Sequence, residues 1–570
     1  MNTQTIHLAS LRATTPEAQA LAAMQAVLRE GHPLAVAYSG GKDSSVLANL
    51  ALTAALAAHS EGRRALLVIT HADVGAVENP EIRALVRGEL QRMQHFAQAH
   101  GLDLRVRVAH PAQYDTFAVR VIGGRALPAF PDSRRDCTSS WKREPSERAL
   151  RQLTQELQRQ GWQAPVLMTG VRRDESTVRA GSIARRGEQA ARLWTDAEGR
   201  LRLSPLLDWT TDDVWSYLGL CRQGVIEAYS DFDDVLRVYQ DAGGSSCVVV
   251  ADAGMERHAK PCASRFGCWA CTAVREDRSL RQMIEGEPQR YGYMRPLAAL
   301  RDFIAHTQYD WSRRQYIGRT IREGFITIAA DTYAPSMLAE LLRYALSAQQ
   351  ATGIEIVSAA QLIAIDARWS LYALAPPFSA LRIWREVMRG KRWKPPALAP
   401  FPKTPVPRYG LIHVGDDWDD EIRSDLVVTG LRDSAWEMFT DNCGPGRRTL
   451  RNGRSVIDVE ATAEVDEEAA WLFLDFEADR MLDGHAEFED DWTQGYRTYL
   501  RFGLLQPGKG QSHLIDSILR RSQWRQRHGL HGGQDLADLR RRLSVPFERQ
   551  GDLFETLGCG EGAREGLNLT

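Results

Sequence analysis

The chain has 570 residues, of which 44% are hydrophobic and 25% are charged, a mixture typical of a globular protein with a large core. Its net charge of −2 gives no overall positive field of the kind that nucleic-acid-binding proteins carry. The first residues lack a basic region followed by an apolar stretch, and the most apolar run, at 46–58, is too short to span a bilayer. We therefore expect a cytoplasmic protein whose cysteines stay reduced.

Short apolar runs alternate with helix-like segments between residues 34 and 169. Four runs indicate strands that are buried on both faces, namely LAVAY (34–38), ALLVIT (65–70), LRVRVA (104–109) and VLMT (166–169). Helices are expected between them, at 44–58, 81–99 and 145–159. This order predicts an α/β fold with a parallel, Rossmann-like sheet and right-handed crossovers. The ligands of such a sheet bind at the carboxyl ends of its strands.

The chain is expected to be mostly helical after about residue 210. Residues 210–218, TTDDVWSYL, begin with Thr and Asp caps, and residues 334–370 indicate two amphipathic helices. PPALAPFPKTPVP (395–407) has six prolines in thirteen residues and predicts a semi-rigid linker. Beyond it, an acidic stretch (458–492) and a basic stretch (519–528) are expected to be solvated faces.

The first predicted strand ends in SGGKDSS (39–45). Gly40 and Gly41 allow a tight turn, and the amides of the turn and of the following helix can bind an anion. Lys42 adds a positive charge, Asp43 can help to hold Mg²⁺, and three hydroxyl groups add donors, from Ser39, Ser44 and Ser45. The sequence is not a Walker loop, and the plainer alternative is an ordinary strand-to-helix turn.

Charged side chains follow the next predicted strands. Asp73 follows the second strand, where it can bind Mg²⁺ or ribose or simply cap a helix. Arginines and a glutamate follow the fourth strand, in GVRRDESTVRAGSIARR (170–186), and arginine suits phosphate binding. Cys137 stands near Arg134, Arg135 and Lys142, which favours a reactive thiolate over a buried inert cysteine.

Four of the eight cysteines form the pattern Cys247-x14-Cys262-x5-Cys268-x2-Cys271. Four thiolates suit either a [4Fe–4S] cluster or tetrahedral zinc. Because the spacing contains a single C-x-x-C pair, it leaves these two possibilities level.

These motifs resemble known families. SGGKDSS is similar to the PP-loop of the ATP pyrophosphatases, which split ATP between the α and β phosphates. GVR…ES…RA and SPLLDWTTDDVWSYL (204–218) resemble phosphoadenosine phosphosulfate (PAPS) reductases. That match implies that residues after the fourth strand face the nucleotide, namely Gly170, Arg172, Glu175, Ser176 and Arg179. Over about residues 20–395, the chain resembles the DndC-like family of iron–sulfur ATP pyrophosphatases in DNA phosphorothioation, which favours [4Fe–4S] over zinc.

The resemblance implies four regions. They are a PP-loop domain (20–220), a helical region with the cysteine cluster (221–394), a Pro-rich linker (395–408) and an extension of unknown role (409–570). It also implies ATP and Mg²⁺ as ligands and DNA as substrate. Cys137 would carry a persulfide sulfur from a cysteine desulfurase, and an SMC-like ATPase and a DNA-binding subunit would be partners. The alternatives are a PAPS or adenylyl sulfate reductase, a tRNA-thiolating PP-loop enzyme and a non-catalytic nucleotide-binding subunit.

Overall fold

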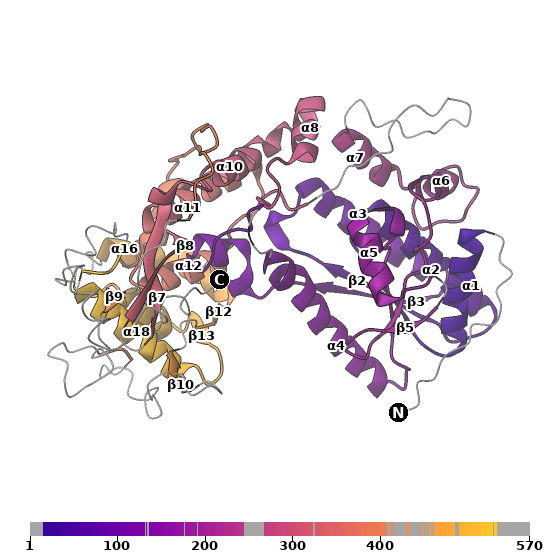
Figure 1. The fold of residues 1–570 in the computed structure, drawn as a ribbon, viewed down its shortest axis with the longest axis horizontal. Coiled ribbons are helices and arrows are strands. Elements are labelled where there is room, and N and C mark those ends of the chain that lie inside the picture. The colour runs from indigo at the N-terminus through magenta and orange to yellow at the C-terminus, as the bar shows by residue number, and fades with distance from the viewer. Residues whose placement is uncertain are drawn as a thin grey trace, which may run out of the picture. The chain divides into compact units, whose positions relative to one another are not determined.

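The computed structural model describes most of the chain, namely residues 15–131, 133, 136–175, 177–190, 192–243, 267–322, 325–406, 412–413, 429–431, 447–449, 455–457, 461–484, 490–527 and 529–532. The chain divides into two compact units (Figure 1). Unit 1 comprises residues 1–112 and 131–298, and unit 2 comprises residues 113–130 and 299–570. Among the described residues, no helix combines the length and the apolar character needed to cross a membrane.

Unit 1 is built on a six-stranded sheet in the order β3-β2-β1-β4-β6-β5. All neighbouring strands pair in parallel except β5 and β6. The strands are β1 (Leu34–Tyr38), β2 (Leu66–Ala72), β3 (Asp103–Ala109), β4 (Val166–Met168), β5 (Trp194–Thr195) and β6 (Leu201–Leu203). The predicted α/β fold with a mostly parallel sheet is confirmed. One detail differs, because β3 lies at the edge of the sheet and is only partly buried.

The helices of unit 1 cover both faces of the sheet. They are α1 (Pro16–Arg29), α2 (Lys42–Ser60), α3 (Pro80–Ala99), α4 (Glu144–Arg159), α5 (Thr177–Arg186), α6 (Thr211–Arg222), α7 (Asp233–Gly243), α8 (Arg278–Gly286) and α9 (Pro288–Tyr291). Side chains alternate along a strand, so Leu34, Val36 and Tyr38 join a large core with α1, α2, α3, α6 and α7. Ala35 faces the opposite way, into a smaller core against α4.

The order of the strands fixes the place for a ligand. From β1 the chain first moves outward to β2 and β3, and it then returns to place β4 on the other side of β1. Open α/β sheets bind ligands at the carboxyl ends of the strands where the order reverses in this way. In this protein the reversal lies between β1 and β4, so residues 39–45 and the residues after Met168 lie beside each other.

Unit 2 is mainly helical. Its helices are α11 (Pro335–Thr352), α12 (Ala359–Leu371), α13 (Ser379–Met388), α15 (Glu467–Phe476), α16 (Ala478–Gly484), α17 (Gln494–Arg501) and α18 (Ser512–Arg527), and α10 (Arg295–His306) carries the boundary with unit 1. The predicted pair of helices at 334–370 corresponds to α11 and α12. The chain also forms a long antiparallel hairpin that the sequence analysis missed, of β7 (Arg314–Arg322) and β8 (Phe325–Tyr333).

The Pro-rich, acidic and basic stretches predicted from the sequence have different environments in the structure. The Pro-rich segment is extended and mostly exposed, and it is bound to the preceding elements. The His306 ring nitrogen lies 2.7 Å from the Leu398 carbonyl, and Trp311 Nε1 donates to Thr404 Oγ1 at 2.7 Å. The described acidic side chains of α15 are exposed, as expected. The basic stretch differs, because α18 is buried along residues 514–526, including Arg520, Arg521 and Arg525.

Candidate functional site

The turn after β1 depends on two features of glycine. Gly40 has φ +76°, which side chains other than hydrogen disfavour. A Cβ atom at this position would also collide with the side chain of Val86 on α3. The turn therefore packs tightly against α3 and delivers the chain directly into α2.

The N-cap residue of α2 supplies no side-chain cap. That residue is Gly41, and the hydrogen bond from the Ser45 amide to the Gly41 carbonyl, at 3.0 Å, begins the helix, so the amides of Asp43 and Ser44 lie in its first turn. The first amides of a helix bind anions because they point outward and carry the positive end of the helix dipole. This 19-residue helix thus presents a candidate phosphate site at the reversal point of the sheet.

The three serines of the loop have different surroundings. Ser44 lies within the loop, where its Oγ accepts from the Ser39 amide at 3.2 Å and donates to the Gly41 carbonyl at 2.9 Å. Ser45 is fully buried, and its hydroxyl lies 3.4 Å from the hydroxyl of Tyr38. Ser39 is exposed. Its Oγ lies 3.2 Å from Ser44 Oγ, so all three hydroxyl groups make contacts within the protein, and Ser39 is the one that solvent reaches.

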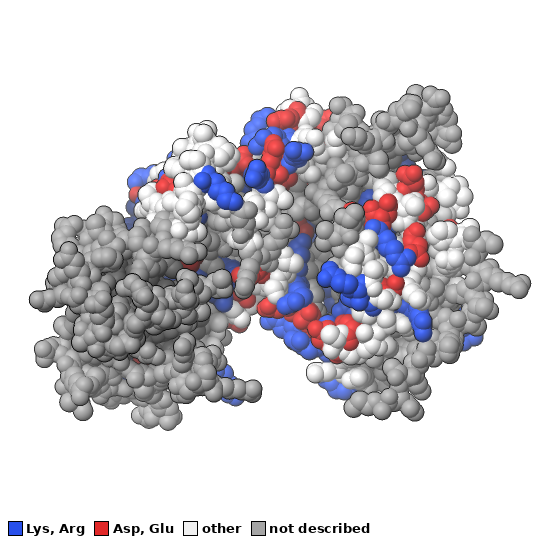
Figure 2. All heavy atoms as spheres, in the orientation of Figure 1, with Lys and Arg blue, Asp and Glu red and all other residues white. Residues whose placement is uncertain are grey.

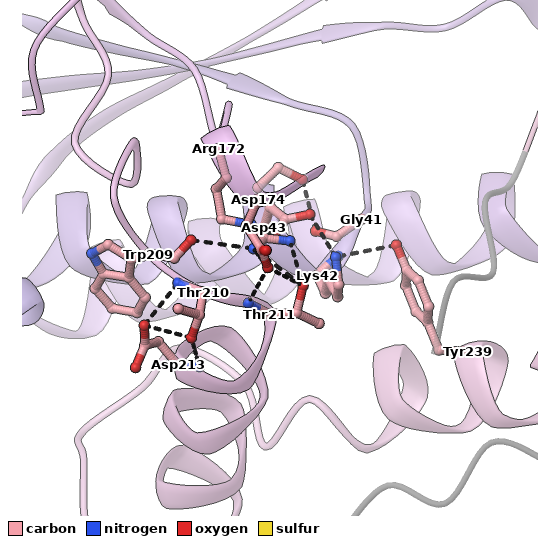
Figure 3. A network of polar contacts seen from close by, with 11 residues as sticks. Gly41, Lys42, Asp43, Arg172, Asp174, Trp209, Thr210, Thr211, Asp213 and Tyr239 are labelled. Atoms are coloured by element: carbon pink, nitrogen blue, oxygen red, sulfur yellow. Dashed lines mark hydrogen bonds and ion pairs between the residues drawn. The ribbon is translucent and has the colours of Figure 1, made fainter. Parts of the chain in front are cut away.

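Asp43 joins the loop to the segment after β4 (Figure 3). Its carboxylate accepts from Lys42 Nζ at 2.8 Å and from Arg172 Nε at 2.6 Å. Arg172 is only 1% exposed, and its other nitrogens donate to Asp174, Thr211 and the Trp209 carbonyl. A buried guanidinium needs such partners. Arg172 therefore organises the site, and Lys42 supplies a positive charge beside the open amides.

The remaining residues predicted after β4 lie near this network or outside the described part. Gly170 abuts α2 so closely that a Cβ atom would lie 3.1 Å from the backbone carbon and oxygen of Asp43. Glu175 is partly exposed in the turn before α5. Arg179 lies in the first turn of α5, where its side chain is not described, and Ser176 lies outside the described residues.

Asp73 lies just beyond β2 and is largely buried. It accepts from the Gly75 amide at 2.7 Å and from Arg83 at 3.3 Å. Burial acts to raise the pKa of Asp73, but the Gly75 amide and the charge of Arg83 outweigh it, so the pKa is lowered overall. The carboxylate therefore stays ionised, and it shapes the loop that follows it.

The loop after Asp73 contacts the C-x-x-C pair, which we call the cysteine knuckle (residues 268–271). Trp269 donates from its indole nitrogen to the Ala76 carbonyl at 2.6 Å and from its amide to the Val77 carbonyl at 2.8 Å. Cys268 also forms an antiparallel β-bridge with Glu78. The knuckle is thus fixed at the carboxyl end of β2, the end of the sheet that carries Asp73.

Cys137 lies at the start of the short helical turn Thr138–Arg143, within electrostatic range of Cys268. Cys268 remains partly exposed as a residue, yet burial of its sulfur raises the pKa of the thiol to about 12. Lys142 opposes this shift, whereas Glu78, Cys271 and Cys137 add to it. The structure therefore gathers Cys137, Lys142 and the cysteine knuckle within electrostatic range of one another.

The structure describes two of the four cysteines that were predicted to bind a metal, Cys268 and Cys271. Cys247 and Cys262 lie outside the described residues. Within the part of the chain that is described, no group of three or more His, Cys, Asp or Glu side chains is arranged as metal ligands. Cys268 and Cys271 offer two soft thiol donors of the kind that zinc and iron–sulfur clusters prefer. A metal cluster at this position stays a prediction.

Two aromatic residues lie beside Lys42 in the site. Tyr239 on α7 brings its hydroxyl to 3.4 Å from the amide nitrogen of Lys42 (Figure 3). The rings of Tyr239 and Trp215 each lie 6.0 Å from Lys42 Nζ. The motif SPLLDWTTDDVWSYL points to Trp215, but no local signal points to Tyr239, which is 197 residues from Lys42.

Comparison with known proteins agrees with this geometry. Residues 33–274 match the sequence profile of the phosphoadenosine phosphosulfate reductase domain, from β1 to just beyond the cysteine knuckle. This stretch is therefore a PAPS reductase-like, PP-loop domain. No curated protein matches the chain.

Two solved structures are similar to part of the chain. PAPS reductase from Candida auris in a phosphate complex is 18% identical over 36% of this chain and 81% of that chain, with a TM-score of 0.22. FMN adenylyltransferase from Candida glabrata, in complex with FMN and an ATP analogue, is 16% identical over 36% of this chain and 55% of that chain, with a TM-score of 0.21.

Proposed function

We propose that this domain cleaves ATP between its α and β phosphates and that residues 39–45 hold the departing pyrophosphate. One observation supports the proposal above the others. The N-terminus of α2, whose N-cap residue is a glycine, lies with Lys42 at the reversal point of the sheet, in a domain of the PAPS reductase type. Amides and a fixed ammonium group can offset the negative charge that builds on a leaving pyrophosphate.

The proposed acceptor is a phosphate of the DNA backbone. One of its unbridged oxygens attacks the α phosphorus of ATP, the bond to the β phosphate breaks, and pyrophosphate leaves. The terminal sulfur of a persulfide on Cys137 then attacks the activated DNA phosphorus, and AMP leaves. Cleavage of the sulfur–sulfur bond by a thiol reductant leaves a phosphorothioate. The location of Cys137 near Lys142 supports its role, because a positive neighbour favours the thiolate.

In this proposal, partner proteins present the DNA to the site. Figure 2 shows basic and acidic side chains interspersed over the described surface of the face that it draws. A surface of mixed sign suits presentation of DNA by a DNA-binding subunit better than capture by this chain alone. A cysteine desulfurase would supply the sulfur, and an SMC-like ATPase would complete the assembly.

Lys42→Ala tests the ATP chemistry. Loss of the ammonium group should lower ATP-dependent pyrophosphate release at least about 100-fold, as expected for removal of a group that stabilises developing charge. The fold should survive, because Asp43 keeps its partner Arg172. Asp43→Ala is a poorer test, since it would strip the buried Arg172 of that partner.

Lys391→Ala is the matched control, because Lys391 is exposed and lies in unit 2. Pyrophosphate release should be measured for both variants with a coupled assay, and folding by circular dichroism. Unchanged turnover in Lys42→Ala would rule out the proposed role of the loop.

The metal proposal has its own test. We expect a [4Fe–4S] cluster held by Cys247, Cys262, Cys268 and Cys271, which would supply electron or sulfur transfer. Protein purified without oxygen should be brown and contain iron and sulfide, and Cys268→Ser should lose both. Cys221→Ala, at a buried cysteine of α6, should keep them. Stoichiometric zinc without iron would establish the alternative metal, and protein without metal would contradict both.

Reduction of PAPS or adenylyl sulfate is the second candidate, and the domain match fits it equally well. Such an enzyme releases sulfite from a sulfonucleotide and does not cleave ATP. Incubation of the purified protein with ATP and, separately, with PAPS and a thiol reductant distinguishes the two reactions. Pyrophosphate is the expected product, whereas sulfite formation without pyrophosphate would favour the reductase.

A further inference from the structure

The first amide of α2 is occupied by a side chain from a distant part of unit 1. The backbone N–H of Lys42 donates to the hydroxyl oxygen of Tyr239 at 3.4 Å. The N-cap residue Gly41 has no side chain with which to perform this task. Tyr239 thus places a polar group among the amides that form the candidate phosphate site.

The position of Tyr239 is fixed by packing. The residue is 7% exposed, and its ring contacts Trp215 edge to face, with the ring centres 5.4 Å apart. Helix α7 is tied to α3 by Arg92, which pairs with buried Glu89 at 2.6 Å and with Asp234 at 2.8 Å. A phenol held in this way needs little reordering to meet a ligand.

The phenol also lies against the backbone of the loop. A Cβ atom on Gly41 would lie 3.1 Å from the Tyr239 hydroxyl oxygen. Gly41 has φ −85°, a conformation that alanine adopts readily. Closeness to Tyr239, more than backbone strain, therefore distinguishes glycine from alanine at position 41.

We propose that Tyr239 is a further phosphate-binding residue and that Trp215 is the residue that positions it. A hydroxyl group can accept one hydrogen bond and donate another. In this proposal the Tyr239 hydroxyl, which accepts from the Lys42 amide, turns its proton toward the phosphate when the loop binds it. The inference rests on the proposed function, because that function makes the loop a pyrophosphate site. The competing explanation is that Tyr239 only caps α2.

The test uses the full chain and inorganic pyrophosphate as the probe, with binding measured by titration calorimetry. Tyr239→Phe should raise the Kd about tenfold, the usual effect of losing a hydrogen bond to a charged group. Tyr217→Phe is the matched control, because its buried hydroxyl accepts from Asn49 and the residue also lies in the large core. It should leave the Kd unchanged. Thermal unfolding without ligand should be recorded for both variants.

Gly41→Ala adds a second, independent test. Its Cβ atom should push the phenol away from the loop and weaken pyrophosphate binding. In the Tyr239→Phe background the same change should have much less effect, since residues that act through one contact are not additive. Full additivity would show that Gly41 acts without Tyr239 and would contradict the proposed contact.

The remaining outcomes separate the inference from the proposed function. Equal affinity of the parent protein and Tyr239→Phe for pyrophosphate would overturn the inference and leave ATP cleavage standing. Pyrophosphate binding that depends on Tyr239, in a protein that does not cleave ATP, would support the inference and overturn the proposed function. A parent protein that binds no pyrophosphate would overturn both.

Discussion

At the scale of single residues, the candidate site consists of charged groups that hold one another in place. Arg172 links the loop after β1, the turn after β4 and the start of α6 through Asp43, Asp174 and Thr211. The sequence places several of these residues at strand ends, which is the correct neighbourhood. It cannot give their pairing, because that depends on β4 lying beside β1 and on which side chains become buried.

A second buried group, Asp366 on α12, makes the stability of unit 2 depend on pH. It is 1% exposed and accepts from the Ala380 amide at 2.6 Å and the Tyr499 hydroxyl at 2.8 Å. Burial raises the pKa of this carboxyl from 3.8 to about 6. The folded state therefore binds the proton more tightly than the unfolded chain does.

The free energy of unfolding should fall as pH rises from about 4 to about 6, by up to about 3 kcal/mol. Asp366→Asn stays neutral and keeps an acceptor oxygen, so it should flatten this dependence. Asp483→Asn, at an exposed position on α16, should keep it. Urea unfolding of unit 2 at several pH values measures the difference. An unchanged slope in Asp366→Asn would show that another group is responsible.

At the scale of elements, helices were predicted better than the environments of strands. Helix α3 was expected at 81–99 and spans Pro80–Ala99, because Asn79 and Pro80 mark its start in the sequence itself. The exposure of β3 and the burial of α18 were not predictable, since both depend on neighbours that are distant along the chain. Strands β7 and β8 were also not predicted, because the chain was expected to be mostly helical after about residue 210.

Two helices of unit 2 approach each other closely at Gly495 on α17. A Cβ atom there would lie 2.8 Å from Ser370 Oγ on α12 and 3.1 Å from Pro377. Gly495→Ala should therefore force α17 away from α12 and cost about 1–3 kcal/mol of stability. Gly484→Ala is the matched control, because Gly484 lies at the exposed end of α16 with nothing within 4 Å of its Cβ position. It should be neutral or slightly stabilising, and thermal unfolding compares the two.

At the scale of the whole molecule, the two units are not consecutive along the chain. Residues 113–130 lie between segments of unit 1 but pack in unit 2. There, Trp369 Nε1 donates to the Ile122 carbonyl at 3.0 Å, and Gln113 pairs with the backbone of Val465. Amino-acid composition reveals a segment such as the Pro-rich stretch at 395–407. The compact units are defined instead by contacts between residues that are distant along the chain. The order of residues along the chain therefore does not reveal that residues 113–130 belong to unit 2.

The attachment of the cysteine knuckle has a consequence for the order of folding. The hydrogen bond from Trp269 to Ala76 joins residues 193 positions apart, so the knuckle is among the last parts of unit 1 to leave the ribosome. Contacts of such long range form late, after the local elements that they connect. The carboxyl end of β2 must already exist when Cys268 and Cys271 reach their place. Delivery of any metal or sulfur to these thiols would then follow assembly of the sheet.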